Sequence, residues 1–149
     1  MDLKQFCEEQ LNTYVKEVLN PEEELDSYIT QSWLNITKPG EFHHEHAHPN
    51  SIISGVFYIS TEKDDNITFI DPNTKIKEFL KFGQKEFNPF NSGIWRIPSV
   101  INELILFPSW LSHCVDKNKK ATTDRVSISF NTFVKGSLGK REELTKLIL

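Results

Sequence analysis

The spacing of apolar residues changes along the chain and divides it into a helical start and a β-rich remainder. In residues 3–19 the apolar positions recur near a period of 3.6, which predicts one amphipathic helix. Asn20-Pro21 ends this pattern, because the residue before a proline is disfavoured in helix. An acidic stretch follows, and from residue 28 the period becomes two, as along residues 33–37. The pattern therefore predicts a helix followed by strands.

Short β-like runs separated by turn residues fill most of the remaining chain. Besides a histidine-rich segment, the predicted strands are residues 28–37, 52–60, 67–70, 94–97, 103–107, 113–115 and 125–134. Residues 74–92 have no clear period and are expected to form an irregular insertion. Apolar residues at 144, 147 and 148 predict a short C-terminal helix. Because no strand–helix–strand alternation is present, the pattern favours an all-β core, an antiparallel sandwich or jelly roll flanked by two helices.

Length and composition place the chain in the class of single-domain globular proteins. Its 149 residues fit one domain, 1–149, with a helical extension at 1–27, a β core at 28–134 and a tail at 135–149. The net charge of −4 disfavours nucleic acid as a partner, and no apolar run reaches the roughly 20 residues of a membrane helix. Cys7 and Cys114 are expected to be free thiols in a cytoplasmic protein. The N-terminal helix and the tail are candidate contacts of a homodimer.

The histidines are concentrated in one short segment. Four of the five lie between residues 43 and 48, and the fifth is His113. If the segment is extended, one face carries His44, His46 and His48, and the other carries His43 and Glu45. A His-x-His pair with a third ligand from a distant strand can hold one metal ion and leave positions open for other ligands. The segment therefore predicts a metal site.

A polar strand face lies downstream of His113. Residues 125–131 alternate strictly, so that Arg125, Ser127, Ser129 and Asn131 share one face. An arginine presents a rigid fork that binds a carboxylate in a bidentate manner, and a serine can donate to the same group. This face therefore indicates a lined cavity for a small anionic molecule.

Four segments together resemble the iron(II)- and 2-oxoglutarate-dependent oxygenases, above all the small members typical of phages and marine bacteria. The segments are His46-Ala47-His48-Pro49-Asn50-Ser51, Ser54-Gly55-Val56-Phe57-Tyr58-Ile59, Leu106-Phe107-Pro108-Ser109-Trp110-Leu111-Ser112-His113 and Arg125-Val126-Ser127-Ile128-Ser129-Phe130-Asn131. Their order and spacing across residues 33–133 carry the resemblance. It implies a double-stranded β-helix and a hydroxylase that uses Fe(II), O2 and 2-oxoglutarate as a small-molecule cosubstrate.

The resemblance also implies roles for individual residues. His46, His48 and His113 would hold the iron, and His43 with Glu45 is an alternative register for the first pair. Arg125 would bind the distal carboxylate of 2-oxoglutarate. Tyr58, Ser127 and Asn35 are the further candidates for the cosubstrate pocket. No catalytic residue is expected beyond the metal site, and the primary substrate is left open.

The first pair of ligands departs from the wider family. Most members use His-x-Asp or His-x-Glu with a distal histidine, whereas the best-matching pair here is His46-x-His48. Three imidazoles would also suit a cupin-like metal dioxygenase or isomerase that does not use 2-oxoglutarate. A non-catalytic barrel with a structural metal is the third hypothesis, because a fold alone does not fix a function.

Overall fold

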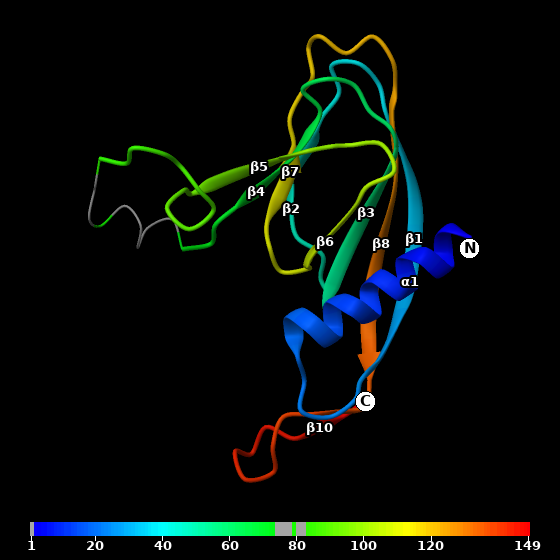
Figure 1. Cartoon of the computed structure of the whole chain (residues 1–149), viewed down its shortest axis with the longest axis vertical. Helices are drawn as coiled ribbons and strands as arrows, with labels where there is room; N and C mark the ends of the chain where they lie inside the picture. The colour runs from blue at the N-terminus through cyan, green and yellow to red at the C-terminus, as the bar shows by residue number, and fades with distance from the viewer. Residues whose placement is uncertain (1, 74–78, 80–82) are drawn as a thin grey trace.

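The computed structural model describes residues 2–73, 79 and 83–149 (Figure 1). The helical elements are α1 (Leu3–Tyr14) and the π-helix η1 (Val15–Leu19). The strands are β1 (Asp26–Thr37), β2 (His43–His46), β3 (Ile53–Ser60), β4 (Asn66–Ile70), β5 (Ile94–Pro98), β6 (Leu104–Pro108), β7 (His113–Val115), β8 (Arg125–Lys135), β9 (Ser137–Leu138) and β10 (Leu147–Ile148). The irregular insertion expected at 74–92 lies partly outside the described residues.

Eight strands form two four-stranded antiparallel sheets. The order is β1-β8-β3-β6 in the first sheet and β2-β7-β4-β5 in the second. The chain passes repeatedly from one sheet to the other, which brings β1 next to β8 and β2 next to β7. This is the strand order of a jelly roll, and it confirms the predicted all-β core. Among the described residues, no helix is both long and apolar enough to cross a membrane.

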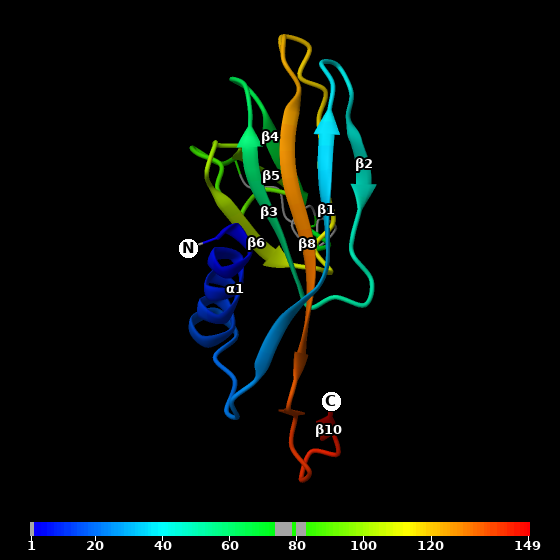
Figure 2. The ribbon, with the colours of Figure 1, turned by 90° about the vertical axis from the view of Figure 1, so that its right-hand side faces the viewer.

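The predicted N-terminal helix is confirmed and covers part of the first sheet (Figure 2). Asp2 caps its first turn by accepting a hydrogen bond from the backbone N–H of Gln5 at 2.8 Å. Asn20, in the left-handed conformation, ends η1. Leu11 is fully buried and packs with Val15 of the helix and Ile53 of β3. The apolar stripe of the helix is therefore what fixes it to the sheet.

The main core lies between the two sheets. Val56, Tyr58, Ile67, Phe69 and Phe107 come from β3, β4 and β6 and are all buried. Because successive side chains of a strand point to opposite faces, each strand contributes every second residue to this layer. Burial of one such side chain contributes about 1.5–3 kcal/mol to the free energy of folding. The core ends at the histidine cluster described below.

The predicted C-terminal helix is wrong. The tail instead forms a small hairpin in which β9 pairs with β10. Backbone hydrogen bonds between Gly136 and Leu149, of 3.0 and 3.2 Å, close the hairpin. Leu144 has a positive φ of 57°, which no residue of a right-handed helix adopts, and its side chain is 95% exposed. The apolar residues have the spacing of an amphipathic helix, but Leu144, Leu147 and Ile148 are all exposed, so they are not buried against any other part of the described chain.

Candidate metal centre

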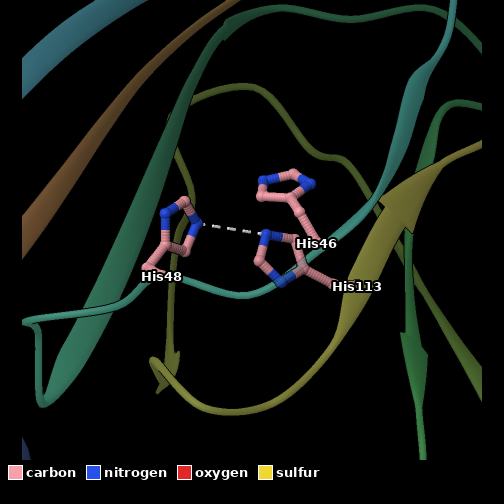
Figure 3. A group of neighbouring side chains, drawn as sticks. All are labelled: His46, His48 and His113. Atoms are coloured by element: carbon pink, nitrogen blue, oxygen red, sulfur yellow. Dashed lines mark hydrogen bonds between the residues drawn. The ribbon is translucent and has the colours of Figure 1, made fainter.

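Three histidines, from β2, from the residues just after it and from β7, converge on one point (Figure 3). His46 ends β2, His48 follows two residues later, and His113 begins β7. The pairing of β2 with β7 sets His46 directly opposite His113. One ring nitrogen of each histidine lies within 4.8 Å of those of the other two, and the Nε2 atoms of His48 and His113 are 3.3 Å apart. The predicted trio is thus brought together.

Backbone carbonyls orient two of these rings. Nδ1 of His113 lies 3.0 Å from the carbonyl oxygen of Leu111, and Nδ1 of His46 lies 2.7 Å from that of His44. An Nδ1–H donating to each carbonyl leaves the Nε2 lone pair free toward the common point. This is the usual way in which a second hydrogen bond fixes the tautomer of a metal-binding histidine. The donor set fits a divalent transition metal ion such as iron(II).

Burial favours the neutral form of two of the three histidines, His113 and His48. It lowers the pKa of His113 to about 4, and the charges of the neighbouring histidines lower that pKa further, against the opposing hydrogen bond to Leu111. Burial followed by the charge of His46 also lowers the pKa of His48. Both imidazoles are therefore in the neutral form at neutral pH, which is the form that binds metal.

A β-bulge in the β2–β7 pair determines which of the other two histidines, His43 or His44, faces the cavity. The four residues of β2 lie opposite only three residues of β7, so His43 pairs with Val115 while His46 pairs with His113. Strict alternation predicted that His44 would share the face of His46, but His44 is exposed and His43 lines the cavity instead. Glu45 is also exposed and accepts a hydrogen bond from the Ser112 hydroxyl at 2.7 Å. His43 thus lines the same cavity as His113 and Glu45 does not, so the alternative pair does not converge with His113 as a set.

Arg125 lies in the same cavity as the histidines. It is the first residue of β8, pairs with Thr37 at the end of β1, and is only 8% exposed. Its guanidinium donates to the Thr37 hydroxyl at 3.2 Å, and the same hydroxyl lies 3.1 Å from Nε2 of His43. Burial lowers the pKa of Arg125, while Tyr58 and Asp65 raise it. An arginine side chain nevertheless remains charged, so the cavity contains a buried cation.

The other predicted cosubstrate residues also line this cavity. They are Tyr58 on β3, Ser127 on β8 and Asn35 on β1. Asn35 donates to the Ser129 hydroxyl at 2.8 Å, which fixes its amide across the β1–β8 pair. Burial raises the pKa of Tyr58, so its phenol stays protonated and can donate a hydrogen bond. The cavity of about 60 Å³ is small and exceeds the volume that a single water needs.

The sequence reasoning missed the role of Thr37. This residue is buried and holds the guanidinium of Arg125 from the facing strand. The alternation of residues 33–37 already placed Thr37 on the face of Trp33 and Asn35, both of which line the cavity. The sequence therefore indicated that Thr37 faces the cavity, but only the β1–β8 pairing shows that Thr37 lies opposite Arg125.

Comparison with known proteins identifies one family. Residues 31–131 match the model of a family described as "Putative 2OG-Fe(II) oxygenase". This range contains Arg125 and the three converging histidines, His46, His48 and His113. No curated protein matches the chain.

The chain is similar to several solved structures. An oxidoreductase of the 2OG-Fe(II) oxygenase family from Burkholderia pseudomallei gives a TM-score of 0.54 at 11% identity, over 83% of this chain and 56% of that one. A prolyl-4-hydroxylase from Pseudomonas putida gives 0.46 at 18% identity, over 83% and 61%. A cupin domain from Bordetella pertussis gives 0.41 at 15% identity, over 78% and 96%. The chain thus spans 56% and 61% of the first two proteins, and at 11% identity the first shows the fold alone.

Proposed function

This chain belongs to the 2OG-Fe(II) oxygenase family, and we propose that it is a non-haem iron(II)- and 2-oxoglutarate-dependent dioxygenase that hydroxylates a second substrate. The observation that carries the proposal is the single cavity shared by a three-histidine cluster and a buried arginine. A metal site alone would not require a buried cation. A cosubstrate that binds the metal at one end and carries a carboxylate at the other requires both.

In this proposal His46, His48 and His113 hold iron(II) through their Nε2 atoms. The bound iron supplies the activation of O2 that couples conversion of 2-oxoglutarate to succinate and CO2 with hydroxylation of the second substrate. The protein fixes the geometry beforehand, because carbonyls hold the rings of His46 and His113. The buried setting keeps the imidazoles of His48 and His113 neutral and ready to bind metal without first losing a proton.

Arg125 binds the distal carboxylate of 2-oxoglutarate at the other end of the cavity. The hydrogen bond to Thr37 restricts the rotation of the guanidinium before the ligand arrives. Tyr58 and Ser127 are the neighbouring hydroxyl donors, and Asn35 lines the same cavity. A charged hydrogen bond in a buried setting is stronger than a neutral one, so Arg125 is expected to dominate cosubstrate affinity.

The donor set also gives one reason to keep a second candidate. The three histidines include no carboxylate, so the charge of the metal is not balanced by its protein ligands. A cupin-like dioxygenase or isomerase that does not use 2-oxoglutarate would fit the same histidines. In that case Arg125 would have no part in the reaction.

The decisive experiment compares two arginines of this chain. Arg125→Met removes the buried guanidinium, and Arg96→Met removes one whose side chain is 60% exposed on β5 beside Asp116. We expect Arg125→Met to weaken 2-oxoglutarate binding by about 30-fold or more, as for loss of a buried charge pair, and Arg96→Met to leave it unchanged. Binding is measured by calorimetry on the Fe(II)-loaded protein under anaerobic conditions, and turnover by succinate formation in air. Absence of 2-oxoglutarate binding and turnover in the wild type would favour the second candidate.

A parallel pair of variants tests the metal ligands. His48→Ala removes a member of the converging trio, and His44→Ala removes a neighbouring histidine that is exposed. Iron(II) retention after desalting should be lost in the first variant and kept in the second. Loss of iron on Glu45→Ala, with retention in His48→Ala, would instead place the ligands in the alternative register.

A further inference from the structure

A second and larger cavity adjoins the metal centre. It is an open groove of about 520 Å³, within the size range of small-molecule sites. β5 and β6 are the edge strands of the two sheets, and side chains from both line the groove. Trp95 comes from β5, Ile105 from β6, and Trp110 with Leu111 from the turn that precedes His113.

Phe107 separates this groove from the histidine cavity. Its side chain lines both spaces. Its ring centroid lies 4.7 Å from that of His113 and 5.0 Å from that of Phe69, which lines the groove from β4. One aromatic ring therefore stands between the groove and a candidate metal ligand. A molecule in the groove would lie beside the metal centre without occupying the space in front of Arg125.

The groove is suited to an uncharged, apolar ligand. Among the described residues that line it, Asp71 is the only one with a charged side chain, and no cation is present. A charged ligand would lose water there, and the described lining residues include no cation to compensate an anionic ligand. Trp110 is 66% exposed although tryptophan is a large apolar side chain, and it lies only three residues before His113. Aromatic walls of this kind bind flat rings by stacking and burial of apolar surface.

We propose that this groove is the primary-substrate site and that it takes an uncharged aromatic or similarly bulky apolar group of the substrate. The inference rests on the proposed oxygenase function and deepens it. The bound group would lie against Trp95 and Trp110. Because Phe107 separates the groove from the histidines, the bound group would anchor the substrate, and another part of the same molecule would reach the metal centre.

The test uses blocked amino acids as probes. The full chain, labelled with nitrogen-15, is titrated with N-acetyl-phenylalaninamide, N-acetyl-alaninamide or N-acetyl-lysinamide and followed by NMR. We expect saturable shifts of the indole N–H signals of Trp95 and Trp110 with the phenylalanine probe alone. Trp110→Ala should weaken this binding about three- to tenfold, as expected for loss of one aromatic contact, and Trp110→Phe should restore most of it.

Leu34→Ala is the matched control. This leucine is an exposed apolar residue of β1 that does not line the groove, so its loss should leave binding unchanged. Equal affinity for the three probes would overturn the proposal, as would unchanged binding in Trp110→Ala. Shifts confined to Trp33, which lines the histidine cavity, would overturn it as well. Succinate formation is measured separately, so selective binding without turnover would contradict the oxygenase function and not the chemistry of the groove.

Discussion

Ser109 is expected to stabilise the turn that leads to His113, and its replacement should lower the free energy of unfolding measurably. Its side chain is fully buried. Its hydroxyl lies 2.7 Å from the Ser51 hydroxyl and 2.8 Å from the Ser54 hydroxyl. Ser109→Ala removes both hydrogen bonds, although Ser54 keeps its bond to Asn131. At about 1 kcal/mol for each bond, the free energy of unfolding should fall by about 2 kcal/mol.

Ser112→Ala provides the control within the same turn. This hydroxyl makes one exposed hydrogen bond, to Glu45, so its loss should change stability by less than about 0.5 kcal/mol. Urea denaturation followed by circular dichroism gives both values, and the melting temperature of Ser109→Ala should fall by about 4–8 °C. Equal stability of the two variants would refute the reasoning that burial makes the Ser109 bonds more valuable.

Three further predictions follow from other parts of the molecule. The carboxylate of Glu62 accepts hydrogen bonds from Thr123 and Thr122, which lower its pKa to about 2. The stabilising effect of this carboxylate is therefore complete above its ordinary pKa of 4.5 and is lost as the pH falls toward 2. The stability difference between wild type and Glu62→Gln, measured by urea denaturation, should therefore shrink from pH 6 to pH 2, and a constant difference would contradict the assignment. Gly55→Ala should lower the free energy of unfolding by about 1–3 kcal/mol in the same assay, because a Cβ there would collide with the ring of Phe130, and an unchanged value would show that the ring can move aside. Metal present at 100 times its dissociation constant should stabilise the protein by about 2.7 kcal/mol in thermal unfolding, and a chelator should reverse the gain; a chelator with no effect on the metal-loaded protein would count against a native metal site.

Local pattern was enough to predict most of the elements. The 3.6 period of residues 3–19 predicted the helix, since one apolar stripe has to meet the sheet, and Leu11 and Val15 do so. The period of two predicted the strands, since every second side chain of a strand has to face the core. The tail shows the limit of this reasoning, because residues 144–148 have suitable spacing but no facing surface to bury it. Leu147 pairs with Leu138 instead.

The sequence by itself determined which residues could do chemistry, because ligand type and alternation are local properties. It indicated the histidine cluster, and it placed Arg125 and Ser127 on one strand face. Only the tertiary structure decided how they combine. The β2–β7 bulge excluded His44 from the cavity, and the β1–β8 register brought Thr37 to Arg125. Register and bulges depend on the partner strand, which is remote in sequence, so no local pattern contains them.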